Sequence, residues 1–259
     1  MDARQRRDSE GLTQRSILLL PGLCTPAEVM RPLKLRLERR LRCPAQIVSL
    51  GAACGDIRDL AERTHGVLEA ALSAQPSAEV DVIGHSMGGL VAAYLLKCLD
   101  QGGRVRRVVT LGTPHRGLAI GRAGFLVPGP VGRTLRQLRP GSSLLGLLSR
   151  LALPSHCELV SIAGLADAIV SPNATRLPER AGQRNLDVDV DHLGLVFSKA
   201  AADSLVRVLA PAALAAEAGH AAPVRSAAPR PRPLAGARAL ARSTRARARR
   251  QVSPKAQRA

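Results

Sequence analysis

Short apolar runs alternate with longer amphipathic segments along the first 210 residues of the chain. The short runs are rich in Val, Ile and Leu and predict buried strands, whereas apolar residues recurring every three or four positions predict helices. Such alternation is typical of a mostly parallel sheet with helices on both faces. The six predicted strands span residues 16–20, 46–50, 80–83, 105–111, 158–162 and 185–190.

The first predicted helix has a recognisable start. Thr25, Pro26 and Glu28 match a capping box, with Thr25 as the N-cap and Pro26 at the first helical position. We therefore expect a helix to about residue 40 that is broken or kinked at Pro32. The remaining predicted helices span residues 57–74, 90–99 and 198–209.

The ends of the chain differ from its body. Residues 1–14 form a charged extension, and beyond Glu217 there are eleven Lys or Arg and no acid. Such a segment buries too little apolar surface to offset its ordering entropy, so residues 213–259 are predicted to be disordered. The formal net charge of +18 is therefore concentrated in this tail, which has the charge for weak contact with an anionic membrane or nucleic acid. The body, residues 15–212, is expected to form one α/β domain.

Composition narrows the classes of function. No apolar stretch reaches the ~18 residues of a membrane span, and the first 15 residues lack a signal-peptide core, so a cytoplasmic protein is expected. The five cysteines form no C-x-x-C pair, and neither H-E-x-x-H nor a phosphate-binding loop occurs. We therefore expect chemistry without a metal or cofactor.

The most informative segment reads Gly-His-Ser-Met-Gly at residues 84–88, directly after an apolar run and before a helical pattern. It matches the G-x-S-x-G nucleophile elbow, in which a strained turn between strand and helix exposes a serine. Gly84 and Gly88 would remove side-chain clashes in that turn, and His85 is expected to point away from Ser86.

A serine nucleophile needs an imidazole as base and an acid to orient it. In α/β-hydrolases these follow the serine in the order acid, then histidine. His192 is the histidine that comes after the last predicted strand, and Asp167 follows the strand at 158–162. We therefore predict Ser86 as nucleophile, His192 as general base and then acid, and Asp167 as the orienting acid. Rival acids lie along the last predicted strand and just after it: Asp187, Asp189 and Asp191.

The oxyanion of the tetrahedral intermediate needs two N–H donors. The Met87 N–H begins the helix after the elbow and is one candidate. The loop after the first strand supplies the other, because Gly22 allows close approach of the backbone and leaves the Leu23 N–H as the natural donor.

Four segments and a histidine together resemble α/β-hydrolases of the bacterial lipase/esterase type, which are triacylglycerol-lipase-like. They are residues 20–23, 84–89, 111–117 and 167–172, followed by His192. The resemblance covers about residues 15–210 and implies an α/β-hydrolase fold with six strands and a short helical cap insert at 118–154. Many relatives have His-Gly where this chain has Pro21-Gly22, and many begin with extra antiparallel strands for which residues 1–14 leave no room.

The leading hypothesis is a serine hydrolase that cleaves carboxylic esters of an apolar acyl chain through an acyl-enzyme. Its partner would be a small-molecule or lipid ester, and no specific protein partner is inferred. The alternatives are an acyltransferase that uses the same triad and a non-catalytic binding protein on this fold. The leucine-rich stretch at 142–151 is either part of a lid that presents leucines to an acyl chain or an ordinary helix packed on the core.

Overall fold

A computed structural model describes residues 15–51, 54–73, 78–100 and 103–210. The charged extension at 1–14 and the predicted tail at 213–259 lie outside the described residues. No helix in the described part of the chain combines the length and the apolar character needed to cross a bilayer.

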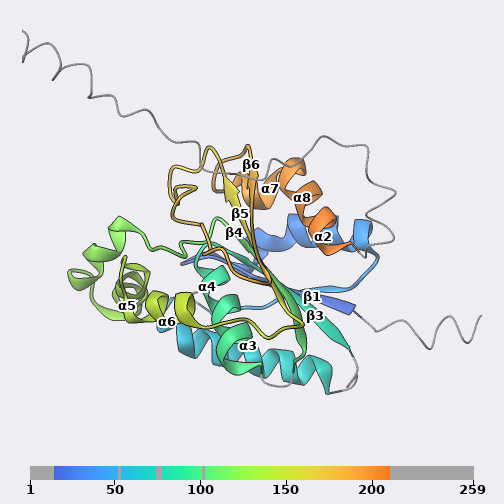
Figure 1. The fold of residues 1–259 in the computed structure, drawn as a ribbon, viewed down its shortest axis with the longest axis horizontal. Helices are drawn as coiled ribbons and strands as arrows, with labels where there is room; N and C mark the ends of the chain where they lie inside the picture. The colour runs from blue at the N-terminus through green and yellow to red at the C-terminus, as the bar shows by residue number, and fades with distance from the viewer. Residues whose placement is uncertain (1–14, 52–53, 74–77, 101–102, 211–259) are drawn as a thin grey trace, which may run out of the picture. The chain divides into compact units, whose positions relative to one another are not determined.

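The centre of the fold is a six-stranded sheet in which every neighbouring pair of strands is parallel (Figure 1). The strand order is β2-β1-β3-β4-β5-β6, so the chain starts one strand in from an edge, adds β2 at that edge and then crosses the sheet in the other direction. The predicted fold class is therefore confirmed. The strands are β1 (Arg15–Leu20), β2 (Ala45–Ile47), β3 (Glu79–His85), β4 (Val105–Leu111), β5 (Glu158–Gly164) and β6 (Gln183–Val188).

Helices cover both faces of this sheet. In Figure 1, α3 and α4 lie below the strands, and α2, α7 and α8 lie above them. The helices are η1 (Ala27–Met30), α2 (Arg31–Leu41), α3 (Ile57–Leu72), α4 (Met87–Tyr94), η2 (Leu95–Leu99), α7 (Gly194–Phe197) and α8 (Lys199–Leu209). Parallel strands need such crossovers, which bury both faces of the sheet.

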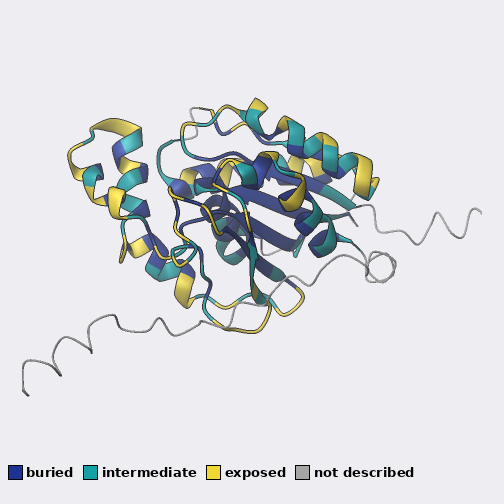
Figure 2. Ribbon diagram, turned by 90° about the horizontal axis from the view of Figure 1, so that it is seen from above, coloured by how far each residue is buried: buried dark blue, intermediate teal, exposed yellow. Residues whose placement is uncertain are grey.

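Successive residues of one strand enter different cores, as the period of two requires. Leu18 and Leu20 of β1 belong to the cluster under α3 and α4, whereas Ile17 and Leu19 belong to the cluster under α2 and α8. Figure 2 shows the strands as the most buried part of the fold. Both cores are aliphatic, as the low aromatic content of 1% requires.

The start of the first helix differs from the prediction. Thr25 caps nothing, because its hydroxyl donates to the Leu23 carbonyl, and Pro26 precedes a short 3-10 helix instead. Pro32 lies in the first turn of α2, where its missing N–H leaves no hydrogen bond unmade, so it begins the helix and does not kink it. The capping box and the kink were therefore wrong.

The insert between β4 and β5 contains three helical segments, η3 (Ala119–Phe125), α5 (Gly129–Leu138) and α6 (Ser143–Arg150). The first part of the insert is therefore largely helical despite its many glycines and prolines. Leu144, Leu145 and Leu148 of α6 are buried in the core cluster under α3 and α4. These three leucines pack on the body of the domain, which favours the packed-helix interpretation for α6.

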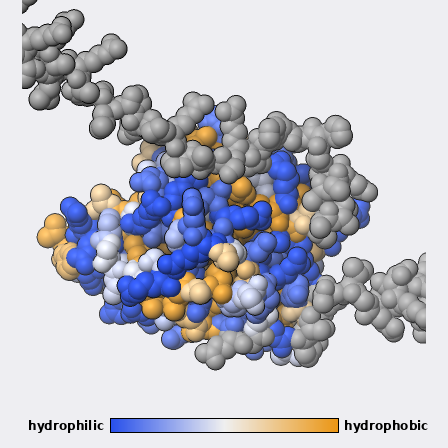
Figure 3. All heavy atoms as spheres, in the orientation of Figure 1, coloured by the Kyte–Doolittle hydropathy of each residue, from blue (hydrophilic) through white to orange (hydrophobic). Residues whose placement is uncertain are grey.

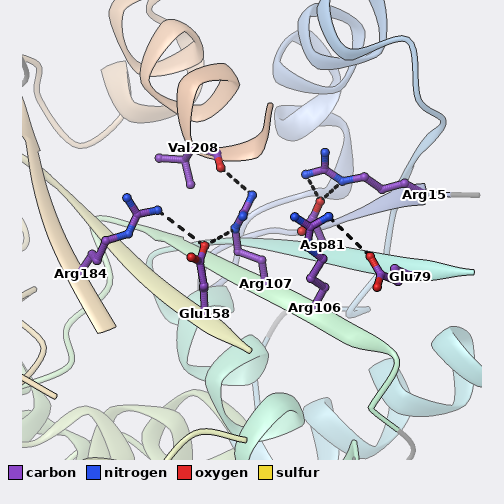
Figure 4. A network of polar contacts seen from close by, with 8 residues as sticks. All are labelled: Arg15, Glu79, Asp81, Arg106, Arg107, Glu158, Arg184 and Val208. Carbon is purple, nitrogen blue, oxygen red and sulfur yellow. Dashed lines mark hydrogen bonds and ion pairs between the residues drawn. The ribbon is translucent and has the colours of Figure 1, made fainter. Parts of the chain in front are cut away.

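Charged side chains link the strands and α8 at the amino ends of the strands (Figure 4). Arg107 of β4 bonds Glu158 at 2.6 Å and the Val208 carbonyl of α8, and Arg15 pairs with Asp81. Burial raises the pKa of Asp81, against the attraction of the Arg15 guanidinium. This network lies at the opposite end of β3 from Ser86, because Asp81 is near the amino end of that strand and Ser86 follows its carboxyl end.

Candidate active site

Ser86 occupies the turn between the end of β3 and the start of α4. Its backbone has φ 53° and ψ −123°, a region that non-glycine residues rarely adopt and that stores strain at functional sites. Its N–H donates to the Leu111 carbonyl at 2.8 Å, and its carbonyl accepts the Thr113 hydroxyl at 2.9 Å. The surrounding structure therefore holds a strained serine in place at the carboxyl edge of the sheet.

Glycine is required on both sides of this turn because the backbone is crowded. A Cβ on Gly84 would lie 2.5 Å from backbone atoms of Gly88 and Gly89. A Cβ on Gly88 would lie 2.4 Å from the Pro21 carbonyl oxygen. The elbow thus packs against the loop after β1, which is where the second oxyanion donor was sought.

The structure brings Asp167 and His192 together. His192 Nδ1 lies 2.6 Å from Asp167 Oδ2, and both side chains are buried. The other carboxylate oxygen, Oδ1, accepts the N–H groups of Ile169 and Val170 at 2.8 and 2.7 Å. The carboxylate is thereby fixed in one orientation, so it can hold the imidazole with Nδ1 protonated and Nε2 free as a base.

Ser86 is linked to this pair through the end of β4. Its N–H donates to the Leu111 carbonyl. The next residue is Gly112, and a Cβ added there would lie 3.1 Å from both Asp167 Oδ2 and His192 Nδ1. Within the described residues the Ser86 hydroxyl makes no hydrogen bond to His192. Catalytic hydrogen bonds are often long in ligand-free structures and tighten when substrate binds.

The two predicted oxyanion donors come from segments next to Ser86. Met87 is the first residue of α4, so its N–H has no acceptor within the helix. In the loop after β1, a Cβ on Gly22 would lie 3.2 Å from the Ser86 Cβ, so this backbone runs directly past the serine. The Leu23 N–H donates to no acceptor in the described part of the chain. Both predicted donors are thus unused.

His85 was expected to point away from the serine, and the structure adds a contact with His192 that was not predicted. Its Nε2 lies 3.1 Å from the His192 carbonyl oxygen, and the two rings are 4.6 Å apart between centroids. Burial lowers the pKa of His85 to about 4, so the ring is neutral and its Nε2–H donates. The chain order of strand and helix does not reveal this contact, because it joins residues 107 positions apart.

None of the rival acids bonds His192 in the described part of the chain. Asp187 pairs with Arg176 at 2.6 Å, Asp191 accepts the Gly194 N–H at the start of α7, and Asp189 is exposed. In the described residues, no three or more of His, Cys, Asp and Glu are grouped in a way that could hold a metal ion.

Exposed apolar residues flank two residues of the site in the sequence. Leu165, Ile169 and Leu193 are adjacent or nearly adjacent to Asp167 and His192 and are 52%, 63% and 55% exposed. Exposed leucine and isoleucine residues so near a candidate site are typical of a site that receives an apolar ligand.

Comparison with known proteins agrees with this fold. The family model of the PGAP1-like alpha/beta domain matches residues 49–185, which is more than half of the chain and includes Ser86 and Asp167. The mature lipase BlEst2 of Bacillus licheniformis has a TM-score of 0.64 at 17% identity, over 77% of this chain and 93% of that one. Lipase B of Aspergillus fumigatus has a TM-score of 0.62 at 18% identity, over 76% and 52%. Phospholipase PlaB of Legionella pneumophila has a TM-score of 0.51 at 14% identity, over 62% and 45%. These likenesses show the α/β-hydrolase fold.

Proposed function

The chain belongs to the family of PGAP1-like α/β domains, and from this premise we propose that it is a serine hydrolase of carboxylic esters with an apolar acyl chain. The observation that carries the proposal is the Asp167–His192 pair, whose atoms are 2.6 Å apart, together with a strained serine whose N–H bonds the last residue of β4. The known lipases that share the fold add support at the level of reaction class.

The first half of the reaction forms an acyl-enzyme. The Ser86 oxygen attacks the ester carbonyl carbon while His192 Nε2 takes the hydroxyl proton. Asp167 stabilises the resulting imidazolium through the Nδ1–H. The carbonyl oxygen becomes an oxyanion and accepts the N–H groups of Met87 and Leu23. Collapse of this intermediate breaks the ester C–O bond, and the leaving alkoxide takes the proton from His192.

The second half releases the acid. A water molecule gives a proton to His192 Nε2 and attacks the acyl carbon, and the same two N–H groups stabilise the second oxyanion. Collapse breaks the bond to the Ser86 oxygen, which regains its proton from His192. An alcohol or thiol in place of water would make the same site an acyltransferase, so products formed with competing acceptors distinguish the two reactions.

The substrate class follows from the exposed apolar residues that flank Asp167 and His192 in the sequence. The exposed side chains of Leu165, Ile169 and Leu193 favour an apolar acyl group over a charged one, because apolar contact removes their surface from water. A lipid ester satisfies this requirement, and so does a small ester with an alkyl acyl chain.

Turnover of p-nitrophenyl acetate, butyrate and octanoate tests the proposal. We expect Ser86→Ala to lower kcat/KM by about 10⁴-fold or more, because the nucleophile is removed and only binding and the oxyanion donors remain. The control Ser73→Ala, at the exposed end of α3, should retain full activity. Full turnover by folded Ser86→Ala would overturn the proposal, and absence of turnover by the folded wild type would favour a binding protein.

A further inference from the structure

A cavity of about 310 Å³ lies behind the nucleophile's helix, separate from the site described above. Its walls come from α4, η2, α6, β5 and the segments that follow β4 and precede β6. Neither Ser86 nor His192 lines it. His115 and Arg116 do, so part of the Thr-Pro-His-Arg-Gly segment at 113–117 has a place in the fold that the ester chemistry does not use.

The cavity is strongly cationic. No carboxylate lines it, whereas five cationic side chains do: Lys97, Arg116, Arg150, Arg176 and Arg180. In the described residues, the one carboxylate paired with any of them is Asp187, which bonds Arg176. Four of the five positive charges therefore have no paired anion there. Figure 3, which views the molecule as in Figure 1, shows many hydrophilic residues, with some apolar ones between them, across the middle of the face turned to the reader.

Two of these cations are fixed by the end of α6. Lys97 Nζ donates to the carbonyls of Leu148 and Leu151 at 2.7 and 3.1 Å, and Arg180 donates to the carbonyls of Ser149 and Arg150 at 2.7 and 3.1 Å. Carbonyls at a helix C-terminus attract cations, which explains why these side chains are held there. These carbonyls carry only partial negative charge and do not neutralise a cation, and each cation keeps N–H donors for a further acceptor.

Arg116 is held in a similar way from another direction. Its Nε donates to the Arg176 carbonyl at 3.2 Å, and one Nη donates to Asn173 at 3.0 Å. The guanidinium is therefore positioned without a counter-charge. Burial lowers the pKa of Lys97 to about 8, and the positive charge of Arg180 adds to that effect. The cavity thus holds several positive charges, and a bound anion would reduce the repulsion between them.

The floor of the cavity is apolar. Leu90 of α4, Leu148 of α6 and Leu159 of β5 line it and are buried in the core. A ligand that satisfies the whole cavity must therefore combine an anionic head with an apolar part. At about 310 Å³ the cavity is near the lower end of the range for small-molecule sites, which excludes a bulky ligand.

We propose that this cavity binds a single-chain anionic amphiphile, with a carboxylate or phosphate head on the cationic side chains and the first part of its alkyl chain on the leucine floor. Arginine suits both heads, because its planar fork bonds two oxygens at once. Bound there, the ligand connects α6 of the insert to α4, the helix that follows Ser86. Occupancy should therefore stabilise the folded chain.

Calorimetric titration of the full chain tests this proposal, in a Ser86→Ala background so that no probe is turned over. The probes are octanoate and octyl phosphate, with octanol as the neutral match. We expect at least one anion to bind about tenfold or more tighter than octanol and to raise the Tm. Preference for one anion identifies the head. Equal binding of all three probes would overturn the proposal.

Variants show where the anion binds. Arg116→Gln and Lys97→Met should each weaken binding of the preferred anion by about tenfold, the loss of a charge-assisted contact. The control Arg31→Gln removes an exposed charge from α2, on the other face of the sheet, and should leave binding unchanged. Equal weakening by all three folded variants would indicate attraction to net charge and overturn the proposal. So would unchanged binding in both cavity variants.

Discussion

Ser86 is the residue on which the proposed chemistry depends, and the chain around it is built to accommodate its strained backbone. The spacing of Gly84 and Gly88 was sufficient to predict the elbow, because a clash of backbone with Cβ is a local property. The contact of His85 with His192 was not predictable, because tertiary folding alone brings together residues so far apart in the chain.

Gly88→Ala should destabilise the fold by about 2–3 kcal/mol, because the new Cβ would lie 2.4 Å from the Pro21 carbonyl oxygen, where neither backbone can yield easily. The control is Gly66→Ala within α3, where nothing lies within 4 Å of the new Cβ. That change should stabilise by about 0.5–1 kcal/mol through helix propensity. Urea denaturation measures both, and equal stability of the two variants would contradict the crowded elbow.

Asp167→Asn should lower kcat by about 10³- to 10⁴-fold while the protein stays folded, because an amide no longer favours the tautomer that leaves Nε2 free. The matched control is Asp189→Asn, an exposed rival acid, which should retain full activity. Ester turnover with circular dichroism as a folding check measures this. If loss of Asp189 proved the more damaging, the assignment of the orienting acid would be wrong.

Among the helices and strands too, features set by local sequence were predictable and features set by tertiary folding were not. The strands were predictable from their apolar runs, although β2 and β6 begin and end earlier than expected. The start of the first helix was not, because Pro26 and Pro32 each satisfy a helix-start pattern; in the structure Pro26 precedes a 3-10 helix and Pro32 lies in the first turn of α2. The lid or core role of α6 was left open for the same reason, since a leucine-rich helix suits both.

The packing of α6 predicts that the insert contributes to global stability. Leu144 is fully buried in the core cluster under α3 and α4. Leu144→Ala should therefore lower the free energy of unfolding by about 2–5 kcal/mol, through lost burial and the cavity that remains. Leu126, which is 87% exposed in the same insert, is the control, and Leu126→Ala should change stability by less than about 0.5 kcal/mol. A Leu144→Ala variant as stable as the wild type would show that α6 opens freely from the body.

For the domain as a whole, two neutral histidines link stability to pH. Burial lowers the pKa of His85 to about 4 and that of His115 to about 3, whereas both titrate near 6.5 when unfolded. Below pH 6.5 the unfolded chain therefore binds protons that the folded chain does not. Stability should fall as the pH drops from about 6.5 to 4, by up to about 1.4 kcal/mol per pH unit for each histidine.

His115→Gln should reduce the slope of unfolding free energy against pH by nearly the amount that one bound proton contributes. A glutamine amide can still bond the Thr110 hydroxyl but does not titrate. His156→Gln removes an exposed histidine and should leave the slope unchanged. Urea unfolding at several pH values between 6.5 and 4.5 gives the slopes. Identical slopes for the wild type and His115→Gln would refute the linkage.

The most direct test of the central claim is the site at which a fluorophosphonate reacts, located by peptide mass spectrometry on the folded full chain. Because the reagent needs a serine activated by a neighbouring base, we predict a single adduct on Ser86 and its loss in folded His192→Ala. A folded wild-type chain that stays unlabelled, or that carries the adduct on another residue, would contradict the proposed triad.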